Sequence, residues 1–583
     1  MNYLKKDNIF LIFILFYFFW VSAFQATDNH WSARIDQDIF LIYNSLLIYE
    51  GFEQDYIDHP AFSTIFILGG IYKILSFFFS NFTLNEIINS EDIDQNFQNL
   101  FSIARFLNST YFFVYTLLLF KILKEFNINR SLRFLGILLL LTFHSLYEAL
   151  FLIRSEVLSI IFALLSFYLL IKFVKYKKSV LYCFFSGFFI CLAILAKVQV
   201  IFFIFFLILI FPFLFSYFNY QFIDNPIVKN KKFFIFSSIF ISVAFILYLL
   251  FEIFFAFSLL TKQTLLFFYK FSIPHLIDPI IYTLVIVFYL FVLNFLSKKN
   301  NIKFLNFITL FYVIFFGFIF CLIFIYFLDL IKLISFNNDI LFFFSNPIHK
   351  MSYYGWGTFN PEETNNFNLG HLTNSIIEIF YYNSKIFPNK NLTINFLGII
   401  VGIVDFFRFF NILILGILFL FFILTKRIKA DLPLVFLLFF GIAILNLTFS
   451  VRDTLGYNIY IYPLFLIAIL ICLNKLKYKY LSKAFLIVLF LTSFIEFYLL
   501  KNYYNLQFTR ENRIYGICKI EKWRNSENYI NNYNLNSFVP LTKNPAKVLS
   551  LFTNMDEKFF TNYCGQIEKK TSWKTNFFNI MIY

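Results

Sequence analysis

Charged residues are scarce in this chain of 583 residues. Asp, Glu, Lys and Arg together make up 14% of it, whereas 60% of the residues are hydrophobic and 96 of them are Phe. Soluble globular domains carry about 25% charged residues, so the composition excludes an ordinary soluble domain. The alternating segments of a transmembrane β-barrel are absent, and apolar runs long enough to cross a hydrocarbon layer of ~30 Å recur instead. Because unpaired backbone groups are costly in lipid, these runs predict an all-α polytopic membrane protein.

The excess of positive charge, +15 at pH 7, does not indicate a nucleic-acid partner. Most Lys and Arg residues stand in clusters between the apolar runs, and such clusters favour the cytoplasmic side of a membrane. Lys5 and Lys6 precede the first run, 8–24, so we expect a cytoplasmic N-terminus and an extracytoplasmic first loop. A signal peptide ending near VSAFQA is the alternative. We favour a retained anchor because the acidic loop that follows needs a fixed place at the membrane surface.

The segment 61–79 is long enough to span, but a full crossing there would place the next basic clusters outside. We therefore predict an interfacial or re-entrant helix for this segment. With the first run, about thirteen spans then follow. The other predicted spans are 101–120, 134–152, 157–174, 180–196, 200–219, 233–257, 279–297, 304–327, 402–424, 433–450, 457–473 and 484–500.

An odd number of spans places the C-terminus outside the cytoplasm. We expect a transmembrane domain over 1–500, with a first outer loop over 25–100 and a long outer loop over 328–395. A small extracytoplasmic region follows over 501–583. It contains Cys518 and Cys564, for which a disulfide and two separate thiols stay equally open. The expected location is a bacterial inner membrane.

The first outer loop is unusually acidic for so apolar a chain. Further ionisable residues fall at the same predicted face. For any one of them, solvation at the membrane surface is a sufficient explanation, and a carboxylate in the first turn of a helix, as at Glu156, complements the helix dipole. The grouping of many such residues on one face instead favours a site. The group comprises Asp36, Asp38, Glu50, Glu53, Asp55, Asp58, His59, Arg154, Glu156, Lys197, His349, Lys350, Arg452 and Asp453.

Several of these residues lie in motifs that resemble the GT-C superfamily of membrane glycosyltransferases, which includes protein O-mannosyltransferases and the aminoarabinose transferases of lipid A. The opening of the first outer loop, with Asp36, Gln37 and Phe40, resembles the acidic opening of that family, and Asp58-His59-Pro60 resembles its turn into an amphipathic helix. The ordered resemblance covers roughly 5–220 and 445–475. Its further motifs are IARFL with Arg105, IRSEVLSIIFALLSFYLL with Glu156, LAILAKVQVIFF with Lys197, and VRDTLGYNIYIYPLFLIAIL with Arg452.

The resemblance implies transfer of a sugar, with inversion, from a polyprenyl-phosphate carrier to a glycan, lipid or protein acceptor outside the cytoplasm. A carboxylate would take the proton of the acceptor hydroxyl. Asp36 is the first candidate for this base and Asp38 the second. Cations would stabilise the departing lipid phosphate. Lys197 and Arg452 are the first candidates, followed by Arg105 and Arg154.

Glu156, Asp58 and His59 are expected to orient the acceptor or the sugar. The sequence identifies no cofactor, and the lipid-linked sugar is a substrate. A divalent metal ion held by these oxygens and His59 stays open, although no ligand spacing of the His-Glu-x-x-His kind supports it. Besides the polyprenyl-phosphate sugar donor and the acceptor, we expect membrane lipid as a partner.

A multi-pass transporter is the main alternative of another class, and a flippase or a polysaccharide polymerase of the cell envelope is also compatible with the composition. Transporters often show inverted repeats and helices that are broken near the middle of the membrane. We find no such symmetry in the sequence, and the ionisable residues gather at one predicted face rather than along a path through the bilayer. These features favour the enzyme.

Overall fold

A computed structural model describes residues 2–21, 38–49, 61–79, 82, 93–141, 153–176, 179–197, 200–218, 304–334, 459–475 and parts of 480–491. The described part of the chain is helical and contains no strand, which confirms the all-α prediction for these residues. Three of its helices are long and apolar enough to cross a membrane, Asn99–Glu125, Ser155–Tyr176 and Thr309–Leu330, and shorter apolar helices accompany them. The chain is thus a helical membrane protein. About thirteen spans and a GT-C arrangement stay predictions.

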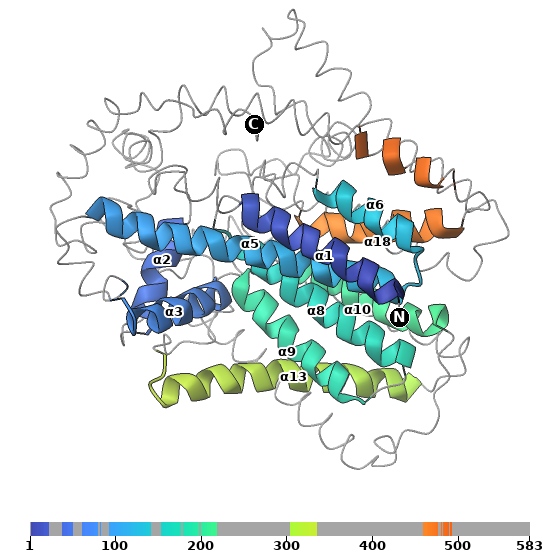
Figure 1. The fold of residues 1–583 in the computed structure, drawn as a ribbon. Helices are drawn as coiled ribbons and strands as arrows, with labels where there is room; N and C mark the ends of the chain where they lie inside the picture. Colours follow the sequence, from blue (N-terminus) through green and yellow to red (C-terminus); the bar gives the residue numbers. More distant parts are fainter. Residues whose placement is uncertain are drawn as a thin grey trace, which may run out of the picture.

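The described helices form a bundle (Figure 1). α1, α6, α9 and α13 run in one direction, and α5, α8, α10 and α18 run in the other. α2 and α3 lie beside the first part of α5. The bounds are α1 (Asn2–Val21), α2 (Asp38–Leu47), α3 (Phe62–Ser76), α5 (Ile93–Glu125), α6 (Arg130–Leu141), α8 (Ser155–Tyr176), α9 (Leu181–Ala196), α10 (Val200–Tyr217), α13 (Phe304–Leu330) and α18 (Ile461–Lys475).

The two ends of the bundle are named here after the glutamates that mark them. At the Glu125 end, α5 and α8 finish side by side. Lys175 in the last turn of α8 donates through Nζ to the carbonyl oxygen of Glu125, the last residue of α5, at 2.6 Å. Asn474, at the end of α18, reaches the same place: its Oδ1 accepts the backbone N–H of Asn129 at 2.9 Å. At the Glu156 end, α8 and α18 begin and α9 finishes. A helix of 22 residues is about 33 Å long, so α8 separates the two ends by roughly a bilayer thickness.

The turn between α5 and α6 shows how polar residues define the Glu125 end. Asn127 has a positive φ of 56°, and the bonds Asn127 N–H to Lys124 O and Ile128 N–H to Leu123 O close α5 with a Schellman motif. Two residues later, Asn129 Oδ1 accepts the backbone N–H of Ser131 at 3.2 Å and caps α6. α6 therefore begins at Arg130, four residues before the apolar run that predicts it.

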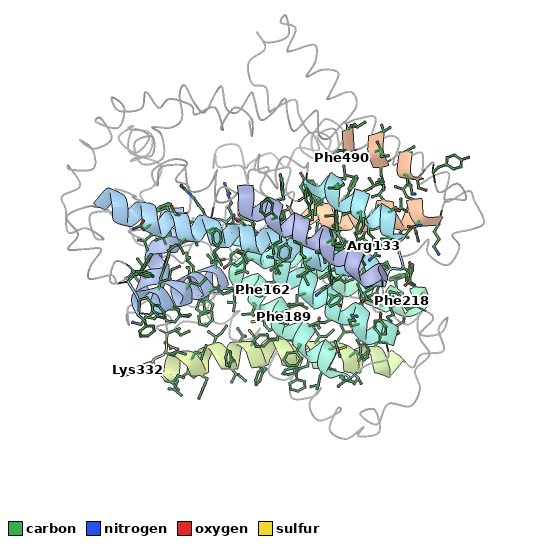
Figure 2. All side chains as sticks on the ribbon, viewed as in Figure 1. Arg133, Phe162, Phe189, Phe218, Lys332 and Phe490 are labelled. Atoms are coloured by element: carbon green, nitrogen blue, oxygen red, sulfur yellow. The ribbon has the colours of Figure 1, made fainter. Side chains whose placement is uncertain are left out.

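Two hydrophobic cores hold the bundle together. The larger core joins α1, α5, α6, α8, α9, α10, α13 and α18. Beside this core, Phe162 of α8 stacks on Phe189 of α9, with ring centroids 5.9 Å apart (Figure 2). The smaller core joins α2 and α3 to α5, α9 and α13, and it includes Ile153 and Leu195 at the Glu156 end. α2 and α3 are therefore attached to that end of the bundle.

Hydrogen bonds anchor α3 to its neighbours at both of its ends. Ser63 Oγ donates to the Leu192 carbonyl of α9 at 2.7 Å, and Tyr72 Oη donates to the Leu100 carbonyl of α5 at 2.9 Å. α3 has 15 residues, fewer than the ~20 that a full crossing needs. Its length agrees with the predicted helix that does not cross the membrane.

Glycine lets α9 and α13 approach closely. A Cβ atom on Gly187 would lie 1.7 Å from the Ile314 carbonyl oxygen, and one on Gly317 would lie 1.8 Å from the Phe184 carbonyl oxygen. Small residues at such contacts are typical of helix pairs in membranes, where association depends on close packing. This pair brings α9, whose last turn precedes Lys197, into a fixed position.

The predicted spans match the described helices closely where the chain is apolar. The predictions 157–174, 180–196 and 304–327 correspond to α8, α9 and α13. α5 is longer than its prediction, because its polar first turns continue the helix beyond the apolar run. The predicted spans 233–257, 279–297, 402–424 and 433–450 lie outside the described residues, as do the region 501–583 and its two cysteines.

Candidate functional site at the Glu156 end

A buried ion pair joins α8 to the end of α9. Glu156 Oε1 lies 3.0 Å from Lys197 Nζ, and the two side chains are 4% and 0% exposed. Within the part of the chain that the structure describes, Glu156 Oε2 has no hydrogen-bond partner. The site thus holds two opposite charges away from solvent, with one carboxylate oxygen left over.

Local structure explains why both side chains stand at this end. Ser155 opens α8, so Glu156 lies in the first turn, where its charge complements the helix dipole. Lys197 follows the last residue of α9 and has extended backbone angles of −157° and 118°. Its N–H still donates to the Ala193 carbonyl at 3.0 Å. The chain therefore leaves the helix at the residue that carries the positive charge.

A pair of hydroxyl groups links this turn of α8 to the late segment of the chain. Ser159 Oγ donates to the Glu156 carbonyl oxygen at 2.8 Å and lies 2.7 Å from Tyr460 Oη. Because Ser159 has a single hydroxyl hydrogen, Tyr460 must donate in the second bond. Tyr460 stands directly before α18. Segments about 300 residues apart in sequence therefore meet one turn below the ion pair.

The helices of the first loop flank the same site. Ile153, three residues before Glu156, and Leu195, two residues before Lys197, belong to the smaller core together with Leu41 and Ile42 of α2. α2, which begins at Asp38, therefore packs at the Glu156 end. Nothing is described of the Asp38 side chain itself.

The other predicted site residues divide into described and undescribed ones. Arg105 is buried in α5, with its guanidinium carbon 5.4 Å from the centre of the Phe101 ring, and its neighbour Ala104 belongs to the smaller core. Arg154 is half-buried beside the start of α8. The remaining predicted residues lie outside the described part of the chain: Asp36, Glu50, Glu53, Asp55, Asp58, His59, His349, Lys350, Arg452 and Asp453.

Sequence reasoning missed Ser159 and Tyr460. Ser159 stands inside an apolar run, where a buried hydroxyl needs a hydrogen-bond partner, so the sequence could have identified it as a polar contact. Tyr460 is one of several tyrosines shortly before Pro463, together with Tyr457 and Tyr462. The sequence pattern does not indicate which of these tyrosines forms a buried contact. The pairing of Glu156 with Lys197 was not predicted either, although both residues were candidates.

Among the described residues, no group of three or more His, Cys, Asp or Glu side chains could hold a metal ion. No protein-family model matches the chain, and no curated protein or solved structure matches it significantly.

Proposed function

We propose that the chain is an integral membrane glycosyltransferase. It moves a sugar from a polyprenyl-phosphate-linked donor to a glycan, lipid or protein acceptor on the extracytoplasmic face, which we equate with the Glu156 end. The observation that supports this most is the buried pair of Glu156 and Lys197. The family resemblance of the motifs that carry these two residues supplies the reaction class.

A purely structural role explains the pair poorly. Burying two charges costs several kcal/mol for each ion, and well-packed apolar residues in place of such a pair are often neutral or more stable. The spare oxygen of Glu156 adds a further polar atom without a partner in the described region. Ionisable residues inside membrane helices mark functional sites by default.

The proposed reaction uses Lys197 as the cation for the lipid phosphate. The acceptor oxygen attacks the anomeric carbon of the sugar, and the bond between that carbon and the phosphate oxygen breaks with its electrons going to the phosphate. Lys197 stabilises this growing negative charge, and Arg452 and Arg105 are the next candidates. Arg154 contributes to the positive potential at the same helix end. Lys197 exchanges its contact with Glu156 for one with the phosphate when the donor binds.

The acceptor needs a base, because a hydroxyl is a poor nucleophile until its proton is removed. Asp36 is the proposed base, with Asp38 as the alternative. α2 begins at Asp38 and packs at the Glu156 end, so Asp36 is within about 7 Å of chain from that helix start. Glu156 and the undescribed Asp58 and His59 orient the sugar or the acceptor.

The test is transfer from labelled polyprenyl-phosphate sugars in membranes that contain the full chain. Asp36→Asn should lower transfer by about 10²-fold or more, because the base is lost while size and polarity are kept. Asp38→Asn is the matched control, and it should retain transfer. The reverse result would make Asp38 the base.

Wild-type turnover in both variants and in the double variant would contradict the proposal. A labelled substrate that crosses the membrane of proteoliposomes without forming a new glycosidic bond would instead show a transporter or flippase. A product that lengthens by repeated addition would show a polymerase.

A further inference from the structure

A second cluster of charges lies at the Glu125 end, far from the site described above. Arg130 Nε lies 2.8 Å from Asp7 Oδ1, and Arg133 Nη2 lies 3.9 Å from Asp7 Oδ2. Asp7 comes from α1, and both arginines come from the first turn of α6. Figure 2 shows Arg133 on α6 beside α1. One carboxylate thus faces two guanidinium groups, which leaves one positive charge in excess.

The excess charge is largely shielded from solvent. Arg133 is 7% exposed. Four buried guanidinium nitrogens have no hydrogen-bond acceptor among the described residues: Arg130 Nε and Nη2, and Arg133 Nε and Nη1. Asp7 Oδ1 is also buried without a hydrogen-bond donor there, although it lies 2.8 Å from Arg130 Nε as an ion pair. Buried donors without acceptors are rare in folded proteins, and each one asks for an explanation such as a bound anion. The two positive charges also repel each other, so an anion that contacts both would relieve the repulsion.

Aromatic rings fix the two guanidinium groups in place. The Arg130 guanidinium lies 5.0 Å from the centre of the Phe134 ring, and that of Arg133 lies 4.9 Å from the centre of Phe120. Phe10 of α1 stacks on Phe134 at 4.2 Å, which closes the wall between α1, α5 and α6. An apolar wall lowers the local dielectric and strengthens the attraction for an anion. The first turn of α6 adds the positive end of a helix dipole.

We propose that this cluster, defined by Asp7, Arg130 and Arg133, binds a phosphate group, which either an anionic membrane lipid or free phosphate would supply. Phosphate oxygens match the forked donors of arginine, and lipids of the cytoplasmic leaflet supply them next to basic residues.

The experiment uses the purified full chain in nanodiscs of phosphatidylcholine, with and without phosphatidylglycerol, and follows thermal unfolding. Phosphatidylglycerol should raise Tm, and salt should weaken the effect because it screens the attraction. Arg130→Gln with Arg133→Gln should lose most of this rise. The matched control is Lys121→Gln with Lys124→Gln, which removes the same charge from two exposed lysines at the same end and should keep the rise.

An equal rise in Tm for the arginine and the lysine variants would overturn the proposal. If the arginine variant does not fold, the wild-type chain decides: a saturable response to phosphatidylglycerol supports the site, and no response beyond that to phosphatidylcholine overturns it. A rise with inorganic phosphate in phosphatidylcholine nanodiscs, equal to that with phosphatidylglycerol, would support the phosphate site but assign it to the free ion.

Discussion

Glutamate and lysine side chains form ion pairs at both ends of α8, but the two ion pairs differ in their exposure and in their number of partners. At the Glu125 end, Glu125 Oε1 lies 2.7 Å from Lys172 Nζ, and Oε2 accepts from Tyr176 Oη at 2.7 Å and lies 3.2 Å from Lys175 Nζ. Both lysines remain 19–23% exposed. At the Glu156 end, a single lysine meets a single carboxylate oxygen, and both side chains are closed off from solvent.

The difference distinguishes a structural contact between helices from a candidate functional site. At the Glu125 end every carboxylate oxygen has a partner and the cations keep access to water, so the arrangement tolerates its charges at low cost. Lys175 also reaches Asn127 Oδ1 at 3.1 Å and ties α8 to the turn after α5. At the Glu156 end the charges are buried with an oxygen unpaired, a state that a stability argument alone does not favour.

The largest effect on stability is expected from removing one charge of the buried pair Glu156 and Lys197, compared with removing both. Glu156→Gln should destabilise the protein by roughly 3–5 kcal/mol, because it leaves Lys197 charged and buried without a counterion. The double variant Glu156→Leu with Lys197→Met should recover most of this stability, since it removes both charges and fills similar volume. Unfolding in detergent micelles measures both, alongside sugar transfer.

Transfer should respond differently from stability. We expect a loss of about 10²-fold or more in the folded double variant, because the cation for the leaving phosphate is gone. A double variant that folds and transfers at the wild-type rate would reduce the pair to a structural contact and erase the contrast between the two ends.

An intermediate effect is expected at the other glutamate. Glu125→Gln should cost about 1–2 kcal/mol, because it weakens charge-assisted bonds whose lysines can turn to water. Transfer should stay near the wild-type rate, as Glu125 lies a full helix length from the proposed site. A loss of transfer as large as that of the buried-pair variants, with stability unchanged, would show that the Glu125 end takes part in the chemistry.

The smallest effect tests the bond that brings α18 to the site. Tyr460→Phe should cost about 1 kcal/mol, the usual contribution of one hydrogen bond, and should lower transfer by less than about tenfold. Ser159→Ala combined with Tyr460→Phe should cost clearly less than the sum of the two single variants, because both lose the same bond. Additive costs would mean that the two hydroxyls act separately.

Much of the fold could be predicted from apolar runs, because the free energy of placing a helix in lipid depends mainly on its own composition. The helices α8, α9 and α13 were found this way. Helix ends were harder to predict from hydropathy, since polar residues determine where a helix begins and ends. Asn129 caps α6 five residues before the apolar run of 134–152, and the polar start of α5 extends a helix that hydropathy does not detect.

The candidate site was predicted as a set of residues but not as an arrangement. Glu156 and Lys197 were both named from the sequence, yet their contact depends on how α8 packs against α9. Tyr460 lies about 300 positions from Ser159, and nothing near either residue indicates the other. A hydroxyl in an apolar run shows only that some partner is needed.

By itself, the sequence determined that this protein is a helical membrane protein, because transfer from water to lipid is a property of each apolar segment. It also determined which residues are expensive to bury. Only the tertiary structure decided which of these residues meet, because a contact between helices requires packing of side chains that are distant in the chain, such as Gly187 against Ile314. That packing closes Glu156 and Lys197 into one pair, whereas the lysines that contact Glu125 stay partly exposed to water.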